Sequence, residues 1–351
     1  MKFKALILSM LLLLSAVAML PAKAAEAAEA VEAQSAAEDN VNVPEIIFGH
    51  IGDSYEWHIT DIGETKVAIH LPVILHSSKT GWHVFSSARL EEAEYEGFHI
   101  DPESGKIVDS EGERPFDISI TKNVLSLMIS AALLLLVVLL TARWYRRHDA
   151  LNEAPTGIAA YIEPLVMLVH GIAKDSIGPD YRRYSPYLCM AFFFILFNNF
   201  LGIIPFFPGG ANLTGNIAIT MVLALCTFLA VNLFGNKHYY KEIFLPDVPG
   251  FLKPIMPIIE VFSAIMKPMS LTIRLFANMM AGHILILSMV CIIFIMAKYG
   301  GVLFGSMSVV SVLFGVFCDM LECLVAFIQA YVFTMLSAIY IGLSRQRPEH
   351  E

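Results

Sequence analysis

Two very long apolar runs near the carboxyl end restrict what this chain can fold into. Residues 255–297 and residues 302–343 are helical in composition with few breaks, and Gly300 and Gly301 join them. A helix rises 1.5 Å per residue, so each run would extend roughly 65 Å, about twice the thickness of the hydrocarbon core of a bilayer. We therefore expect a hairpin of two long helices that are strongly tilted or broken inside a membrane.

The rest of the chain supports the membrane class. Apolar residues make up 56% of the sequence, which soluble domains rarely reach. Shorter apolar runs predict further helices at residues 124–142, 187–207 and 216–234. Residues 156–175 form an amphipathic stretch that we place on the cytoplasmic surface, and residues 237–241 read as a basic loop. The predicted fold is an all-α integral membrane protein with about five membrane-embedded helices, in a membrane domain of residues 121–351.

The first 120 residues have a different character. Residues 1–24 resemble a cleavable signal peptide, with a basic start, an apolar run and small residues at the cleavage site. Residues 25–120 hold 20 of the 32 acidic residues and 5 basic ones. We expect this exported polar tail to be partly disordered over residues 25–43. A strand is suggested at residues 66–75, and a β-hairpin turn at residues 101–105.

Basic residues set the predicted orientation. The first span is followed by Arg143, Arg146 and Arg147, so its carboxyl end is expected in the cytoplasm. This agrees with an exported amino-terminal tail. Arg345 and Arg347 place the carboxyl terminus on the cytoplasmic side as well.

Neither the cysteines nor the histidines form a metal-binding pattern. The five cysteines lie in apolar runs and are expected to be buried small hydrophobic residues. Six histidines are scattered along the tail, where a metal site is conceivable but surface histidines are favoured: His50, His58, His70, His76, His83 and His99. We expect no cofactor and no bound metal. The net charge of −9 belongs to the tail and gives no reason to expect nucleic acid.

A strip of charged residues follows one side of the first long run. Glu260, Lys267 and Arg274 are seven residues apart, and seven helical residues return to within about 20° of the same face. Asn278 stays near that face, whereas His283 points to the opposite side. An ion pair between Glu260 and Lys267 is the structural alternative to a functional role.

Arg274 is the most unusual of these residues. A charge at mid-membrane costs at least about 2.5 kcal/mol even on mild insertion scales. No acidic residue lies within four positions of Arg274, so its partner must come from elsewhere in the fold or from another protein. An arginine stays protonated at any biological pH and cannot relay a proton. Arg274 is therefore expected to attract anions and repel cations.

The second long run has its own polar strip. Asp319, Glu322 and Gln329 are spaced by three and seven residues, which favours a shared face. Asp319 can also be structural or lie near an interface. His283 and Glu322 are side chains that can exchange protons along a wetted path, with hydrogen-bonded packing as the alternative for the histidine.

Three groups of residues resemble the subunit a family of F-type ATP synthases. They are residues 270–279 followed by Ala281, Gly282 and His283; residues 329–334; and a set at the end of an earlier span, comprising Asn198, Gly202, Pro205, Asn212, Thr214 and Asn216. The order and the distances match as well. This resemblance covers about residues 120–345 and is specific, because separated motifs agree with one topology.

The resemblance implies a non-catalytic stator subunit. In that family the arginine matching Arg274 faces a ring of c subunits, each with a membrane-embedded carboxylate. Protons pass through two offset half-channels, near positions matching His283 and Glu322. Some members exchange the acid and the histidine at these positions, which implies that the two lie close together. Asn278 and Gln329 would orient the arginine or water, and supporting roles would fall to Glu260, Lys267, Asp319 and Ser270.

The implied partners are the c ring, the subunit b stator, other ATP synthase subunits and membrane lipid, in a bacterial inner membrane. The ring is expected to contact the face that carries Arg274, at Leu275 or a neighbouring position. Two alternatives stay open. One is a secondary transporter that binds an anionic substrate through Arg274, although we find no internal repeat. The other is a structural assembly subunit whose polar strips contact partner helices.

Overall fold

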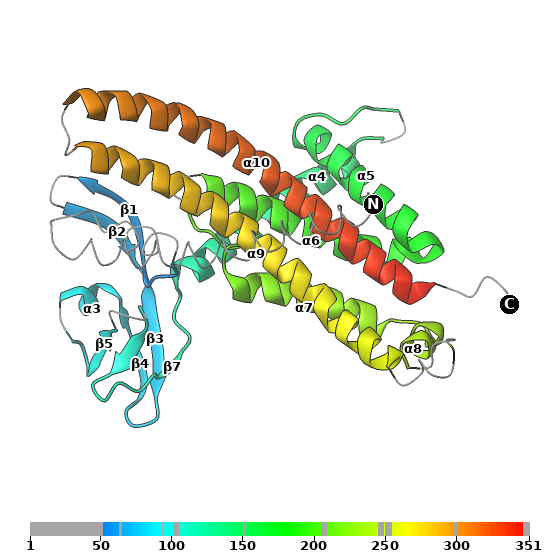
Figure 1. The fold of residues 1–351 in the computed structure, drawn as a ribbon, viewed down its shortest axis with the longest axis horizontal. Helices are drawn as coiled ribbons and strands as arrows, with labels where there is room; N and C mark the ends of the chain where they lie inside the picture. Colours follow the sequence, from blue (N-terminus) through cyan, green and yellow to red (C-terminus); the bar gives the residue numbers. More distant parts are fainter. Residues whose placement is uncertain are drawn as a thin grey trace, which may run out of the picture.

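The computed structural model describes residues 52–346, except 63–64, 93, 102–104, 150–151, 205–208, 245–248, 250–254 and 298–300. A small β-containing part lies at one end of a group of long helices (Figure 1). The predicted signal peptide at residues 1–24 and the predicted disordered segment at 25–43 lie outside the described residues.

The β part contains three small antiparallel sheets. Strands β1 (Glu56–Ile62) and β2 (Thr65–His70) form the first, and β5 (Phe98–Ile100) and β6 (Ile107–Asp109) form the second. The third has the order β4-β3-β7, with β3 at Pro72–Ser77, β4 at Gly81–Ser86 and β7 at Phe116–Asp117. A short helix, α3 (Ala88–Glu92), follows β4.

Alternating side chains build the core of this part. Val73 and Leu75 of β3 and Phe85 of β4 pack with Leu90, Phe98 and Ile107 from α3, β5 and β6. The predicted hairpin around residues 101–105 is confirmed by the β5–β6 pair, although its turn residues 102–104 are outside the described set.

The single strand predicted at residues 66–75 is wrong. The chain forms two strands there, because Leu71 ends the pairing of β2 with β1. The backbone N–H of Leu71 donates to the carbonyl of Tyr55 and to Oγ of Ser87, at 3.2 and 3.1 Å. Pro72 has no N–H to give to a ladder, and it stands at the first position of β3, where a proline is tolerated.

Within the residues that the structure describes, seven α-helices follow the β part: α4 (Lys122–Arg147), α5 (Ile158–Ile177), α6 (Tyr181–Ile203), α7 (Ile217–Leu233), α8 (Lys237–Phe244), α9 (Met256–Ala297) and α10 (Gly301–Arg345). Four segments are long and apolar enough to cross a membrane, with α5 and α6 counted as one, and α7 is a shorter apolar helix. The predicted all-α membrane fold with a small β segment is confirmed. Residues 237–241 form part of helix α8 rather than a loop.

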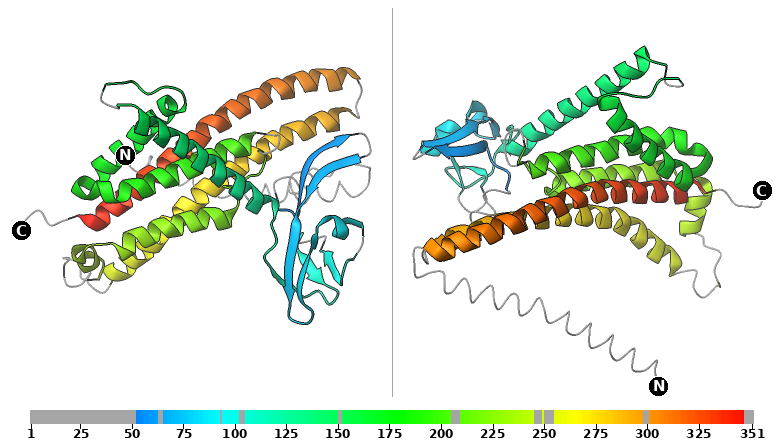
Figure 2. Two further views of the ribbon diagram at one scale, coloured as in Figure 1. Left: turned by 180° about the vertical axis from the view of Figure 1, so that it is seen from behind. Right: turned by 90° about the horizontal axis from the view of Figure 1, so that it is seen from above.

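Helices α9 and α10 lie side by side as a long antiparallel hairpin in every view (Figures 1 and 2). Helix α10 packs against α5 and α6, and α9 packs against α7. Small residues allow close approach: Ala326, Ala330 and Ala338 are fully buried in α10. A Cβ added to Gly342 would lie 2.0 Å from the carbonyl oxygen of Ser176 in α5. Small residues at such contacts are typical of helix packing in membranes.

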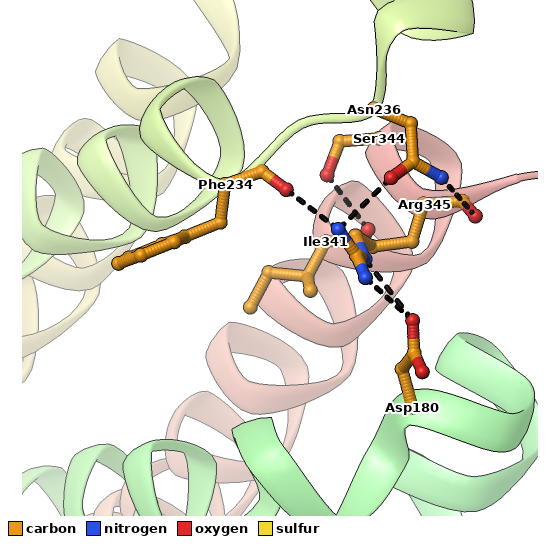
Figure 3. A network of polar contacts seen from close by, with 6 residues as sticks. All are labelled: Asp180, Phe234, Asn236, Ile341, Ser344 and Arg345. Atoms are coloured by element: carbon orange, nitrogen blue, oxygen red, sulfur yellow. Dashed lines mark hydrogen bonds and ion pairs between the residues drawn. The ribbon is translucent and has the colours of Figure 1, made fainter.

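The end of α10 is held by a polar network (Figure 3). Arg345 donates from Nε and Nη2 to Oδ2 of Asp180, at 3.2 and 2.6 Å. Its Nη1 donates to the carbonyl of Phe234 and to Oδ1 of Asn236. Asn236 donates back to the carbonyls of Ser344 and Arg345. This network joins α10 to the α5–α6 and α7–α8 connections.

The cysteine prediction is only partly right. Cys291 and Cys318 are buried and Cys189 is half-buried, but Cys226 and Cys323 are exposed on the helices. A thiol that faces lipid has a small free-energy cost, because the lipid tails are themselves apolar. The rule that apolar residues lie inside therefore applies to soluble proteins and not to this surface.

Candidate functional site

Arg274 lies on the outer side of α9. Leu271, Leu275 and Met279 form the buried stripe of this helix, at spacings of four residues, and are each no more than 2% exposed. Arg274 falls on the other side and is exposed. It makes no hydrogen bond or ion pair with any residue that the structure describes.

Several exposed side chains close to Arg274 on α9 are apolar. Met266, Met269 and Ile273, one to eight residues before it, are 42–53% exposed. A guanidinium without a counter-charge in such a surface points to a partner outside the chain. Leu275, by contrast, is 1% exposed and faces the chain's own interior. The ring contact was expected at Leu275 or a neighbouring position, and of these positions Ile273 and Ala277 are exposed.

Glu260 and Lys267 form no ion pair in the structure. They are seven residues apart, so their backbones are separated by roughly 10 Å along the helix axis. Instead, Nζ of Lys267 lies 5.6 Å from the ring centroid of Tyr340 in α10, a cation–π geometry. The structural alternative that paired these two residues is wrong.

The acid and the imidazole meet inside the α9–α10 hairpin. Nε2 of His283 lies 3.8 Å from Oε1 of Glu322. The side chain of Glu322 is 5% exposed and that of His283 is 16% exposed. The expected proximity of these residues is confirmed. Both oxygens of Glu322 are buried without a hydrogen bond from any described residue, which is unusual for buried polar atoms.

Two glycines leave room for this pair. A Cβ added to Gly282 would lie 2.7 Å from Oε1 of Glu322. A Cβ added to Gly202, in α6, would lie 3.5 Å from Nε2 of His283. The glutamate can therefore lie beside α9 only because residue 282 has no side chain. The sequence places Gly282 beside His283 but does not show that it faces Glu322.

A cluster of buried amides continues from the pair toward the α6–α7 connection. Asn199 donates to the carbonyl of Ala326 in α10 at 3.1 Å and accepts from the Thr214 hydroxyl at 2.7 Å. Oδ1 of Asn198 and Nδ2 of Asn212 are buried and make no hydrogen bond with the described residues. Sequence reasoning missed Asn199, although two adjacent asparagines inside an apolar run were a signal for it.

The remaining predicted residues separate into two groups. Gln329 is buried beside Glu322 on the inner face of α10, and both are about 6–7% exposed. Asp319 is exposed, three residues before Glu322. Three helical residues turn about 300°, so Asp319 lies about 60° around the helix from Glu322, at the exposed edge of the face that the two residues share. Asn278 is half-buried and Ser270 is exposed on α9.

These positions define a class of membrane protein. Helix α9 carries an unneutralised cation on its outer side and an acid–imidazole pair against its inner side. The cation can hold an anionic group of another molecule, while the pair and the amides can bind protons or water. This is an integral membrane protein with an exposed cation on one side of α9 and buried polar side chains on the other.

Comparison with known proteins agrees with this class and identifies the family. The model of the ATP synthase A chain matches residues 124–342. "ATP synthase subunit a" of Chloroherpeton thalassium is 40% identical over 67% of this chain and 69% of its own. The proteins of the same name from Chlorobium phaeobacteroides and Myxococcus xanthus are 42% and 40% identical, over 68% and 75% of their lengths. The chain belongs to the ATP synthase A chain family, the non-catalytic membrane subunits of that complex.

The β part has a separate match. Residues 46–125 fit the model of a domain of unknown function, DUF8433. The ATP synthase match begins at residue 124, so the two matches meet at the start of α4. Family membership favours a role in the ATP synthase membrane sector over the secondary-transporter alternative.

Proposed function

We propose that this chain is the stator subunit that conducts protons through two half-channels to and from the carboxylates of a subunit c ring. The observation that carries the proposal is Arg274, exposed on α9 with no counter-charge among the described residues. A ring of c subunits would supply a mobile carboxylate to this face. Proton flow would then drive rotation and ATP synthesis.

The strength of the electrostatic attraction supports a transient contact between Arg274 and a ring carboxylate. Unit charges about 4 Å apart attract by roughly 4 kcal/mol at an effective dielectric constant of 20. This is enough to favour an ionised carboxylate beside Arg274, and weak enough to let the ring move on. Because the guanidinium stays protonated, it would also block direct proton passage between the two half-channels.

The second part of the proposal is the path inside the hairpin. His283 and Glu322 would pass protons toward the ring from one side of the membrane. Buried polar atoms without protein partners are commonly hydrated, and Asn198, Asn212 and Glu322 hold such atoms on one route. Gln329 and Asn278 would orient Arg274 or water, and Glu260, Lys267, Asp319 and Ser270 would support the path.

Orientation follows from the ends of the helices. The last turn of α4 carries Arg146 and Arg147, and α10 ends at Arg345. Both ends lie away from the β part (Figures 1 and 2). By the positive-inside rule, this end is cytoplasmic in a bacterial inner membrane, and the β part is exported. Subunit b and further ATP synthase subunits are the other proposed partners.

The test replaces Arg274 with alanine. Arg274→Ala is expected to abolish ATP-driven acidification of inverted membrane vesicles, because no charge would hold the ring carboxylate. The measurement is the quenching of a pH-sensitive dye, together with the amount of assembled complex in the membrane.

Arg182→Ala is the matched control, because Arg182 is an exposed arginine on α6. It should pump at the wild-type rate. Normal pumping by Arg274→Ala, with a normal amount of complex, would exclude the proposed role.

A further inference from the structure

The exported β part has an apolar face that its own core does not use. Trp82 and Val84 in β4 are 61% and 70% exposed, and Phe116 and Ile118, in and just after β7, are 65% and 50% exposed. Ordinary protein surfaces expose large apolar side chains singly, whereas this small sheet exposes four of them together.

Strand register places these side chains in two complete rows. Trp82 and Phe116 both pair with His76 of β3, on its two sides. Val84 pairs with Ile74, and the N–H of Ile118 donates to the carbonyl of Ile74. Paired residues of antiparallel strands point to the same face of a sheet. The rows Trp82–His76–Phe116 and Val84–Ile74–Ile118 therefore form one surface, here called the apolar sheet face.

The opposite face of the same sheet is the one that is already covered. Val73, Leu75 and Phe85 point to it and pack with α3, β5 and β6. Asp117 also points there, where Oδ2 accepts a hydrogen bond of 2.5 Å from the hydroxyl of Tyr55. This bond and burial together raise the pKa of Tyr55. The six residues of the apolar sheet face include no acidic side chain, although the exported segment as a whole is acidic.

The apolar sheet face is joined to the first membrane span by a short, hydrogen-bonded connection. Ile118 lies four residues before α4, and four residues reach at most about 14 Å. The N–H of Ile120 donates to the carbonyl of Pro72, and Thr121 caps α4 by accepting from the N–H of Val124.

The start of α4 is tied to the β part itself. The N–H of Lys122 donates to the carbonyl of Ser54, and that of Asn123 donates to Oδ1 of Asp53 at 3.0 Å. The β part therefore cannot swing freely away from the membrane. Exposed apolar side chains continue along α4 itself, at Val124 and Met128.

We propose that the apolar sheet face rests on the lipid bilayer surface at the amino-terminal end of α4. It forms a continuation of the lipid-facing side of the first span, with Trp82 and Phe116 in the headgroup region. Tryptophan and other amphipathic aromatic side chains are enriched at that depth. Charged side chains also lie near this face: Lys79 is paired with Glu111 and Glu113, and Asp109 and Arg114 line the same hollow beside Phe116. The proposal needs only that the chain crosses the membrane, and it is independent of the proton path.

The experiment uses the intact ATP synthase in vesicles of phosphatidylethanolamine and phosphatidylglycerol. A benzophenone amino acid replaces Val84 or Phe116 in separate proteins, and the adducts formed on illumination are identified by mass spectrometry. Both positions are well exposed, so the probe does not disturb the core. The expected result is a phospholipid adduct at position 84 and at position 116.

The matched control carries the probe at Lys106, an exposed residue beside the β5–β6 turn, on the other side of the sheet. No lipid adduct is expected there. An adduct with another subunit or with a second copy of this chain at positions 84 and 116 would overturn the proposal. So would the absence of any lipid adduct at both positions, or equal lipid labelling at position 106.

Discussion

At the residue scale, the arrangement of α9 depends on which side each residue faces. Arg274 and His283 are nine residues apart, which is two and a half helical turns, so they lie on opposite sides. One side is exposed and the other lies beside Glu322. Helix α9 itself therefore separates the cation from the acid–imidazole pair, and no other segment of protein has to lie between them.

Gly282 provides a residue-scale test of the inner path. Gly282→Ala would place a Cβ 2.7 Å from Oε1 of Glu322, so the carboxyl must move. Displacements of about 1 Å in reactive geometry can cost about 100-fold, so we expect ATP-driven proton pumping to fall on the order of tenfold or more. The measurement is the initial rate of vesicle acidification, normalised to assembled complex.

The matched control for this substitution is Gly315→Ala, in α10. A Cβ at residue 315 meets no heavy atom within 4 Å, and alanine favours a helix by about 1 kcal/mol over glycine. This variant should pump normally. If Gly282→Ala also pumps at the wild-type rate, the close approach of Glu322 to α9 has no part in proton transfer.

At the element scale, the carboxyl end of α10 is fixed by the Arg345 network. Elsewhere the polar contacts of α10 are single ones, such as the bond from Asn199 to the carbonyl of Ala326, and apolar contacts between helices in lipid give little drive for association. Arg345 adds directional bonds to two connections that are far apart in sequence (Figure 3). It thereby sets where the end of α10 lies relative to α6 and α7.

Removing this arginine is expected to loosen the helix packing. Hydrogen bonds to charged groups contribute about 1.5–3 kcal/mol, and the partial exposure of Arg345 and Asp180 reduces this. Arg345→Ala should therefore lower the free energy of unfolding by about 1–2 kcal/mol. The measurement is the thermal unfolding midpoint of the purified protein in detergent, with Arg182→Ala as the control. An unchanged midpoint would show that the network does not hold α10.

At the scale of the whole molecule, three regions of the chain differ in character. The β part lies at one end, the Arg345 network lies at the other, and the outward side of α9 and α10 runs between them (Figure 1). Large apolar residues cover this outward side, and Arg274 interrupts them. A mainly apolar surface on which Arg274, Ser270 and Asp319 are also exposed suits lipid along part of its length and a membrane partner at Arg274.

Cysteine crosslinking tests that assignment. Ile273→Cys and Ala277→Cys place a thiol on the exposed side of α9, next to Arg274. Oxidation should join each of them to a cysteine placed near the membrane carboxylate of subunit c, giving a product of the combined mass on a non-reducing gel. Leu275→Cys faces the interior and should give none. Crosslinking at Leu275 alone would mean that the other side of α9 faces the ring.

Much of the architecture could be predicted from local patterns. Apolar runs predicted the helices α4, α6, α7, α9 and α10 with ends within about six residues, since the length of an apolar run is a property of neighbouring residues, and an amphipathic stretch predicted α5. The β5–β6 hairpin was also predicted, from its turn residues. The break at Leu71 was not, because it depends on hydrogen bonds to Tyr55 and Ser87, which are remote in sequence.

The sequence by itself determined that this chain lies in a membrane and that Arg274 has no acidic residue within four positions of it. The first conclusion, and the significance of the second, follow from the free-energy cost of placing apolar side chains in water and charged side chains in lipid, which can be judged along a single helix. Only the tertiary structure decided that Leu275 and Glu322 face inward, that Asp319 faces outward, and that Asn199 reaches Ala326. Those outcomes depend on which helices become neighbours and on how closely glycines let them approach. Both are determined by the packing of the whole helix bundle and not by any one segment.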